Sequence, residues 1–391
     1  MSSLVHPNLE ELPDRADVVV VGAGLTGAAA AWAGTRRDLS VVVLEQFTIG
    51  HAHGSSHGSA RIVRRAYPDE LYVGLTGRAF ELWQELEASA AMPILTMTGG
   101  IDHGDRRDPE RIAEIFSRAG VRHALLGAGE AESRWPGMRF DGPVLFHPQA
   151  GVMDADRAIQ AFVGQAKAGG ALVFENASML DAQLDPGGVI VQTSIGTVTA
   201  RRLVLAAGGW LAGLAESLTG TRLRLPRLSV TQQQAFHFER SEPDVEWPIT
   251  VHKLASGAGL QAYHLPGGRD GGPDHDRKIS EHCGTTGPTT PLTRDGLIDP
   301  TVRERVTSYV REWLPGLVPL PRREVSCLYT STDNEDFLLD IVDNRIVIAS
   351  PCSGHGAKFA PVLGEIITGL VTGEARPDPR FSLAGHLAWT S

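Results

Sequence analysis

Gly22, Gly24 and Gly27 form a Gly-x-Gly-x-x-Gly turn, a pattern whose chemistry is the binding of a dinucleotide pyrophosphate. The first glycine permits a tight turn, the second lets the backbone approach the phosphates, and the third allows a helix to pack closely on a strand. Ala23 and Thr26 belong to the same turn, so we expect them to face the same ligand. The phosphates would lie at the helix N-terminus, where free N–H groups and the helix dipole favour an anion.

A strand and a helix must hold this turn in place, and the sequence predicts both. The apolar run over 17–21 predicts a buried strand that ends at the first glycine, and the Ala-rich stretch after the turn predicts a helix. A second strand, expected over 40–44, ends at Glu45, close to the spacing of roughly 20 residues at which an acidic side chain reaches a ribose hydroxyl. The sequence therefore predicts dinucleotide binding, although the turn itself does not distinguish FAD from NAD.

Segments typical of a nucleotide-binding domain recur in the middle of the chain. An apolar strand expected over 202–207 ends in Ala-Ala-Gly-Gly, which lets the backbone approach a cofactor closely. Gly208 and Trp210 are therefore expected to bind the cofactor. Val173, on a strand expected over 170–174, is also expected to bind the cofactor.

The nucleotide-binding segments alternate with β-rich segments, which predicts two interleaved domains. The last nucleotide-binding segment contains a strand expected over 345–349, and the Gly/Pro/Asp-rich stretch over 267–276 predicts a surface excursion. Because NAD-binding modules are usually contiguous, the interleaving favours FAD. The predicted fold class is α/β, with a Rossmann-type FAD-binding domain interleaved with a β-rich, α+β substrate-binding domain. The expected FAD-binding segments are 14–90, 150–222 and 326–391, and the expected substrate-binding segments are 91–149 and 223–325.

The composition argues against several classes of function. The 391 residues are 42% hydrophobic, enough for two cores, and the formal net charge of −10 argues against a nucleic-acid partner. No apolar run is long enough to span a bilayer and no signal peptide is expected, so we expect no membrane partner. Three cysteines are too few for a disulfide framework, and the expected compartment is the cytoplasm. His51, His53 and His57 have no acidic or cysteine partners at ligand spacing, so we expect no metal.

Three further motifs combine glycine with charged, hydroxyl or thiol side chains. They are His-Gly-Ser-Ser-His-Gly-Ser-Ala-Arg-Ile-Val-Arg over 53–64, Cys-Leu-Tyr-Thr over 327–330 and Ser-Gly-His-Gly-Ala-Lys-Phe over 353–359. In type and order they resemble the motifs of the monomeric sarcosine oxidase and N-methyltryptophan oxidase family, flavoproteins related to glycine oxidase and D-amino-acid oxidase. The resemblance covers nearly the whole chain. It implies FAD as cofactor, a small amino-acid-like substrate and O2 as partners, and a monomer.

The resemblance assigns several residues to the cofactor. Cys327 is implied to carry the flavin through its 8α-methyl group, as an 8α-S-cysteinyl link. The remaining residues that the resemblance places at the flavin are Ser55, Ser56, His57, Arg61, Gly354, Gly356 and Lys358.

The resemblance also assigns residues to the reaction. Arg64 and Lys358 are implied to hold the substrate α-carboxylate by charge-assisted hydrogen bonds, which would place the adjacent C–H for hydride transfer to flavin N5. The product would be an imine, and O2 would be reduced to H2O2. Lys278, helped by Arg61, is implied to stabilise the superoxide that the first electron creates. The other residues implied at this site are the catalytic Tyr263 and His282 and the substrate-binding Tyr329.

The substrate and the electron acceptor stay open. Ala357 stands where relatives commonly have Phe, and residues 350–353 also differ, so a larger N-methyl amino acid or a cyclic imino acid is as well supported as sarcosine. One alternative to an oxidase is a dehydrogenase that passes electrons to a quinone or carrier protein. Another is a non-catalytic flavin-binding subunit, against which Arg64 and Lys358 argue, because such a subunit needs no residues that hold a carboxylate.

Overall fold

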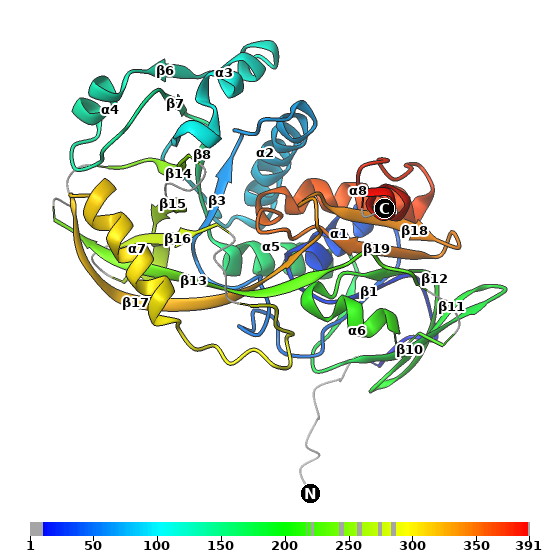
Figure 1. Cartoon of the computed structure of the whole chain (residues 1–391). Helices are drawn as coiled ribbons and strands as arrows, with labels where there is room; N and C mark the ends of the chain where they lie inside the picture. Colours follow the sequence, from blue (N-terminus) through cyan, green and yellow to red (C-terminus); the bar gives the residue numbers. More distant parts are fainter. Residues whose placement is uncertain are drawn as a thin grey trace, which may run out of the picture.

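In the part of the chain that this computed structural model describes, two eight-stranded β-sheets and the helices that cover them form the main body (Figure 1). The described residues are 11–216, 218–219, 223–241, 246–255, 260–272, 276–282 and 287–389. Strands from the start, middle and end of the chain form the first sheet, and strands from the stretches between them form most of the second. The predicted fold class, α/β with an interleaved β-rich region, is confirmed.

The first sheet contains β1 (Arg15–Val21), β2 (Val41–Leu44), β9 (Leu172–Phe174), β10 (Met179–Asp185), β11 (Gly188–Thr193), β12 (Gly196–Leu205), β18 (Leu338–Val342) and β19 (Ile346–Ser350). Its central strands are buried on both faces, which explains their uninterrupted apolar sequences. Val18 and Val20 of β1 pack into one core, and Val19 and Val21 pack into the other. β1 runs parallel to both β2 and β12, so the carboxyl ends of these strands meet at one edge of the sheet.

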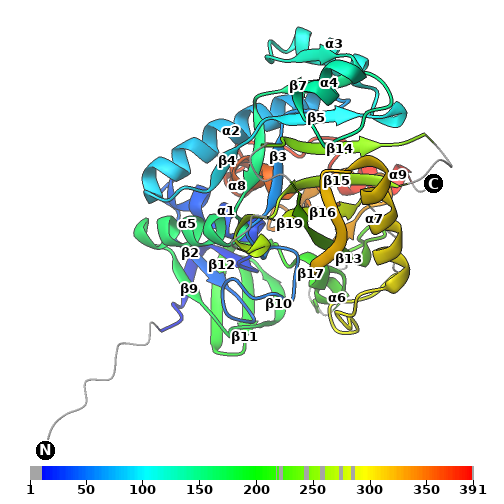
Figure 2. The same ribbon diagram turned by 90° about the vertical axis from the view of Figure 1, so that its left-hand side faces the viewer.

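The core that contains Val18 and Val20 includes residues of the helices α1 (Leu25–Thr35), α2 (Glu70–Ala90), α5 (Ala155–Ala168) and α8 (Ala360–Thr372) (Figure 2). Small residues let them approach closely. A Cβ on Gly364 of α8 would lie 2.4 Å from the carbonyl oxygen of Ala29 in α1. Asp69 and Asp154 cap α2 and α5, because each carboxylate accepts a backbone N–H of the first turn.

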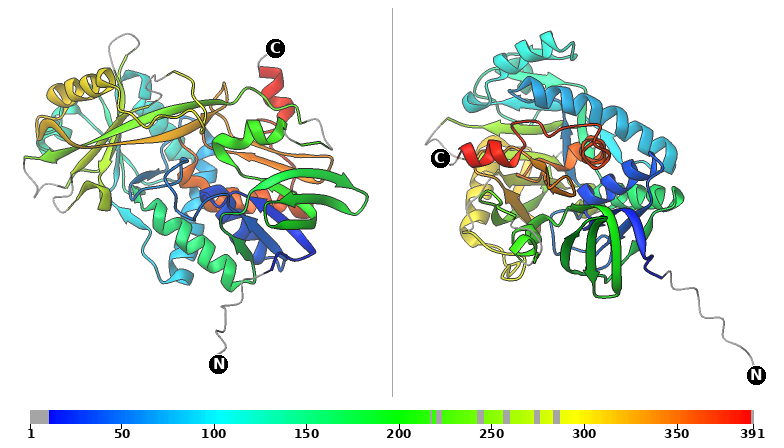
Figure 3. Two further views of the ribbon diagram at one scale, coloured as in Figure 1. Left: turned by 90° about the horizontal axis from the view of Figure 1, so that it is seen from below. Right: turned by 90° about the vertical axis from the view of Figure 1, so that its right-hand side faces the viewer.

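The second sheet has, in spatial order, β17 (Leu317–Ser331), β13 (Ser229–Arg240), β16 (Arg277–Glu281), β15 (Gln261–Pro266), β14 (Ile249–Lys253), β5 (Gly100–His103), β7 (Val144–His147) and β6 (Ala124–Leu126). The long strands β13 and β17 run antiparallel, side by side across the molecule (Figure 3). The helix α7 (Pro300–Trp313) packs on β17 and contributes Val306 and Val310 to the core of this sheet. β5 and β14 pair in parallel.

A smaller sheet of β3 (Arg61–Arg64), β8 (Ala150–Met153) and β4 (Leu95–Met97) completes the strands of the described residues. None of the helices in the described part of the chain is long and apolar enough to cross a membrane. The remaining helices are α3 (Pro109–Arg118), α4 (Ala128–Arg134), α6 (Leu211–Glu216) and α9 (Leu383–Trp389), with short 3-10 turns at Asp105–Arg107, Gly208–Trp210, Gly268–Gly271 and Ala357–Phe359.

Candidate active site

A cavity of about 640 Å³ is lined by residues of both large sheets and of β3. Gly22, Glu45, Ala206 and Ser350 of its wall lie at or just beyond the carboxyl ends of β1, β2, β12 and β19. Open α/β sheets bind ligands at this edge, because loops and helix N-termini converge there. The cavity therefore lies where the sequence predicts a dinucleotide.

Every predicted site residue lines this cavity except Gly27 and Val173. Gly27 instead sets the packing of α1 on β1, because a Cβ on it would lie 1.8 Å from the carbonyl oxygen of Gly22. Gly22 has a φ of +99°, and a Cβ on it would lie 2.6 Å from the carbonyl oxygen of Ala206. Val173 is buried in the core on β9, away from the cavity wall.

The N-terminus of α1 opens onto this cavity. Gly24 is the N-cap residue and has no side chain that could cap the helix. The Leu25 N–H donates to Ser56 Oγ at 3.2 Å, and a Cβ on Gly24 would lie 3.1 Å from the same oxygen. An uncapped helix N-terminus beside a glycine turn suits a pyrophosphate.

Glu45 ties the glycine turn to the end of β2. Its Oε2 accepts the Ala23 N–H at 2.9 Å, its Oε1 accepts the Phe47 N–H at 3.0 Å, and His51 Nε2 lies 3.4 Å from Oε1. Burial by itself would raise the pKa of Glu45, but the hydrogen bonds to its carboxylate, from His51 foremost, hold that pKa below its ordinary value. The ionised carboxylate thus positions the turn.

The substitution Glu45→Gln is expected to lower the free energy of unfolding by about 1–2 kcal/mol, because the amide offers one oxygen to two backbone N–H groups. In a chain of this length that corresponds to a Tm lower by about 1–3 °C, measured by calorimetry. Glu374→Gln is the control, since Glu374 is 65% exposed and pairs with Arg37 at the surface. Equal Tm values for Glu45→Gln and the control would contradict the positioning role of Glu45.

Arg64 and Lys358 both contact Tyr67. The Arg64 guanidinium carbon lies 4.6 Å from the Tyr67 ring centroid, and Lys358 Nζ donates to Tyr67 Oη at 3.1 Å and to the His355 carbonyl at 2.6 Å. Burial, together with repulsion from Arg64 and Arg107, holds the pKa of Lys358 well below its ordinary value. Arg64 Nη1 is buried and, within the described part of the chain, has no hydrogen-bond partner. An anion bound here would pair this guanidinium and favour the charged lysine.

A buried acid that the sequence analysis missed lies next to Arg64. Asp102 on β5 is fully buried, and Arg107 Nε donates to its Oδ1 at 2.5 Å. Arg64 Nη1 lies 3.8 Å from the same oxygen, and His147 Nε2 lies 3.6 Å from Oδ2. Burial by itself would raise the pKa of Asp102, but Arg107 foremost holds it well below its ordinary value. The sequence signal for Asp102 is an aspartate inside a short apolar segment. Such a position indicates a buried acid, and a buried acid needs a cationic partner.

Lys278 and Arg61 form a second group of cations. Lys278 is buried on β16, and its Nζ donates to the Ala60 carbonyl at 3.3 Å, while Arg61 donates to the carbonyls of Ala60 and His57. Burial, followed by repulsion from Arg61, lowers the pKa of Lys278 to about 8. Arg61 and Arg64 are three residues apart on β3, so their side chains leave opposite faces of the strand. One strand therefore supplies an arginine to each group of cations.

The stretch over 267–276 is not a free surface excursion in its described part, which corrects the prediction. Asp270 Oδ2 accepts the Ser59 N–H at 2.7 Å, and the Asp270 N–H donates to Ser59 Oγ at 2.8 Å. Asp270 also lines the cavity. These reciprocal bonds hold the start of β3 and hence Arg61. Sequence patterns do not reveal them, because the two residues are far apart in the chain.

An aromatic group lies near the last motif. Tyr263 Oη and Tyr329 Oη are 3.4 Å apart. Gly354 has a φ of +71°, and a Cβ on it would lie 2.6 Å from the Tyr329 ring and 3.2 Å from the His282 ring. His282 Nε2 lies 3.9 Å from a carboxylate oxygen of Glu335. Only glycine at 354 allows this approach of backbone and rings.

Two free cysteines, Cys327 on β17 and Cys352, line the cavity. Burial raises the pKa of the Cys352 thiol. Cys327 is the residue implied to carry the flavin, and Cys352 offers a matched control on the same cavity wall. The third cysteine, Cys283, lies outside the described residues.

Comparisons with known proteins show the family to which the chain belongs. A family model described as FAD dependent oxidoreductase matches residues 17–370. Monomeric sarcosine oxidase of Bacillus sp. (strain B-0618) is 30% identical over 378 residues, which cover 93% of this chain and 94% of that protein. N-methyl-L-tryptophan oxidase of Yersinia pestis (strain Pestoides F) is 28% identical over 387 residues, which cover 94% and 98%. The structure of NikD, an unusual amino acid oxidase essential for nikkomycin biosynthesis, is 25% identical with a TM-score of 0.82, over 95% of this chain and 98% of that one.

Proposed function

Because the chain belongs to the FAD-dependent oxidoreductase family, we propose that it is an FAD-dependent oxidase of a secondary amine, namely an N-methyl or cyclic imino α-amino acid. The similarity to oxidases named for sarcosine and for N-methyl-L-tryptophan supports this class of substrate. The observation that carries the proposal is the buried Nη1 atom of Arg64, which has no hydrogen-bond partner among the described residues, in a side chain that lines the cavity with Lys358. A planar anionic carboxylate would complete this group.

The residues present fit FAD. The uncapped N-terminus of α1 and the glycine turn would hold the pyrophosphate, and a cavity of about 640 Å³ has room for a dinucleotide. Trp210 and Ser56 line the same cavity, and Cys327 would form the 8α-S-cysteinyl link. Glu45 would present its carboxylate toward the ribose while it holds the turn.

When bound, the flavin would take a hydride from the substrate C–H at N5 and deliver two electrons to O2, so that the products are an imine and H2O2. The side chains of the protein would orient the reactants. Arg64 and Lys358 would hold the carboxylate and thereby fix the position of the adjacent C–H. Lys278, in its ammonium form, would stabilise superoxide through a positive charge held in place by burial.

A panel of amines, assayed under air for H2O2, tests this proposal. The panel pairs N-methyl amino acids and cyclic imino acids with the same amines lacking the carboxyl group. We expect H2O2 in proportion to substrate for the carboxyl-bearing members. Rapid loss of flavin colour with little H2O2 would favour a dehydrogenase that uses a quinone or carrier. Failure of every member to remove the colour would favour the non-catalytic flavin-binding subunit.

The substitution Cys327→Ser is expected to release the flavin when the protein is denatured, because serine cannot form the thioether. The measurement is yellow colour in the supernatant and in the pellet after acid precipitation. Cys352→Ser should keep the colour in the pellet, as the unsubstituted protein does. If the colour stayed with denatured Cys327→Ser, the covalent link would be assigned to another residue.

Burial and repulsion from Arg61 lower the pKa of Lys278 to about 8. The reaction with O2 is therefore expected to slow as the pH rises through this value. Below this value the side chain is a cation, and above it the positive charge is lost, so the rate should fall about tenfold per pH unit. The rate of reoxidation is measured by stopped flow between about pH 6 and 10, the range over which Lys278 would change charge. Lys278→Arg should move the fall to higher pH, and an unchanged profile in that variant would assign the titration to another group.

A further inference from the structure

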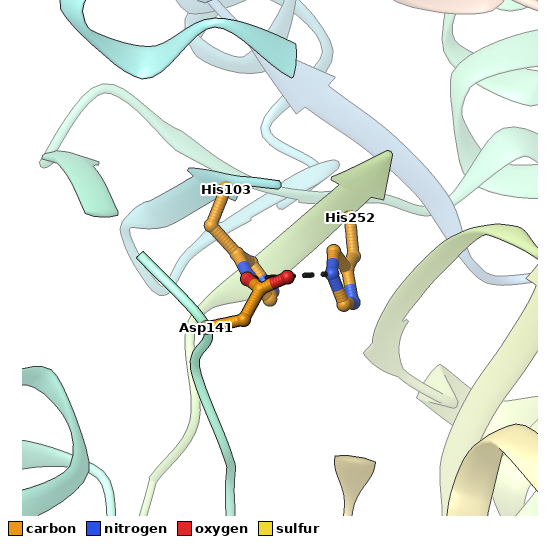
Figure 4. A group of neighbouring side chains, drawn as sticks. All are labelled: His103, Asp141 and His252. Atoms are coloured by element: carbon orange, nitrogen blue, oxygen red, sulfur yellow. Dashed lines mark ion pairs between the residues drawn. The ribbon is translucent and has the colours of Figure 1, made fainter. Parts of the chain in front are cut away.

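Two buried histidines, His103 and His252, lie close to an aspartate, Asp141, at the second sheet (Figure 4). β5 and β14 pair in parallel with His103 directly across from His252, so both side chains leave the same face of the sheet. Their rings stack with centroids 3.8 Å apart. Asp102 precedes His103, so its side chain leaves the other face and reaches Arg107.

The three side chains point toward one another with their ligand atoms close together (Figure 4). Asp141 Oδ1 lies 3.9 Å from His103 Nδ1 and 4.0 Å from His252 Nε2, and one ligand atom of each residue lies within 4.8 Å of the others. His103 is 2% exposed and His252 is 0% exposed, and both of these nitrogen atoms are buried with no hydrogen-bond partner among the residues that the structure describes. Unpaired buried nitrogen atoms are costly, so they point to a ligand.

The surrounding residues prepare the imidazoles to act as ligands. His252 Nδ1 lies 3.0 Å from Tyr309 Oη, and an Nδ1–H that donates to this oxygen leaves the lone pair on Nε2, toward Asp141. The group offers two imidazoles and a carboxylate, the donor set of zinc sites.

We propose that His103, His252 and Asp141 bind a divalent transition-metal ion of the zinc class, with water as the fourth ligand. Bond lengths of about 2.0–2.2 Å require the three ligand atoms to move together by roughly 1 Å. Asp141 can make most of this movement, because its side chain is 37% exposed and lies in the loop before β7. The same exposure gives the ion a path from solvent. The ion would tie this loop to β5 and β14.

The site lies on the opposite face of β5 from Arg64 and is distinct from the candidate active site. The expectation of no metal rested only on the histidines near residue 50. The cross-strand pair of His103 and His252 becomes apparent only with the register of β5 and β14. Aromatic neighbours, Phe140 against His103 and Trp313 against His252, pack the rings but leave the two nitrogen atoms unpaired.

Metal binding is tested on the flavin-loaded protein, freed of any affinity tag and stripped with a chelator. Equilibrium dialysis against Zn²⁺ is expected to give one tightly bound ion per chain, and Zn²⁺ should raise the Tm. Co²⁺ is the spectroscopic probe, since a four-coordinate nitrogen and oxygen site should absorb at wavelengths longer than those of the flavin. No retained Zn²⁺ and no Co²⁺ band in the unsubstituted protein would overturn the proposal.

Substitutions then locate the ion. Asp141→Asn keeps the shape of an exposed side chain and is expected to weaken Zn²⁺ binding at least about tenfold, and His252→Gln should abolish the tight site. His123→Gln is the matched control, because His123 lies outside this group. Equal Zn²⁺ binding by Asp141→Asn and the unsubstituted protein would overturn the assignment, even if His252→Gln failed to fold. The readouts do not depend on turnover, so they stand apart from the proposed oxidase activity.

Discussion

Lys278→Met is expected to slow the reaction of the substrate-reduced protein with O2 by about 10²–10³-fold, the usual effect of removing a fixed group that stabilises developing charge. Superoxide is an anion, and Lys278 is a buried cation, 5% exposed, beside Arg61. The effect of a charge is largest where water is excluded. Methionine keeps the apolar stem of lysine and removes the charge and the hydrogen bond to the Ala60 carbonyl, which still accepts from Arg61. Reduction by substrate should change by no more than a few-fold.

Two stopped-flow experiments separate these steps. Anaerobic mixing with substrate follows the loss of yellow colour, and mixing of the reduced protein with O2 follows its return. Lys358→Met should show the opposite pattern, with slow reduction and near-normal reoxidation, because Lys358 contacts Tyr67 beside Arg64. Lys167→Met, in the last turn of α5 and exposed, should change neither rate. Equal slowing of both steps in Lys278→Met would mean that this lysine does not act on oxygen.

Much of the fold was predictable from local sequence, because the central strands of the first sheet pack into a hydrophobic core on each face. Val18 to Val21 form a continuous apolar run, and such a run fits a strand that is buried on both faces. The glycine turn was also predictable, since Gly22 and Gly27 make contacts that a Cβ would forbid. The match to the FAD-dependent oxidoreductase family confirms the resemblance inferred from the motifs.

The rest of the candidate site depends on register and contacts between distant segments. Asp102 was missed because its partners, Arg64 on β3 and Arg107 in a 3-10 turn, meet it only in the folded chain. Asp270 was assigned to the surface because nothing near it in sequence marks its bonds to Ser59. Val173 was assigned to the cofactor from its strand alone, and the pleat turns its side chain into the core. Local patterns predict elements, but the pairing of elements decides which side chains meet.

Arg64→Ala is expected to lower kcat/KM for carboxyl-bearing substrates by about 10²–10³-fold. A buried charge pair loses roughly 2–5 kcal/mol when one partner is truncated, and each 1.4 kcal/mol is a factor of ten. Arg64 Nη1 lies 3.8 Å from Asp102 Oδ1 but has no hydrogen-bond partner among the described residues, so a bound carboxylate could accept a hydrogen bond from it. Lys358 alone would then hold the carboxylate, with a pKa that burial already depresses.

The decisive measurement is a ratio of two substrates. For each variant, kcat/KM is compared between an N-methyl amino acid and the same amine without its carboxyl group, which Arg64 cannot bind. The ratio should fall by about 10²-fold in Arg64→Ala, whereas a general loss of activity would lower both values and leave the ratio unchanged. Arg65→Ala is the matched control, because the Arg65 guanidinium bonds to Thr76, Gln149 and the Val73 carbonyl and does not line the cavity. An unchanged ratio in Arg64→Ala would remove this arginine from carboxylate recognition, since the control accounts for any effect of losing a neighbouring positive charge on folding.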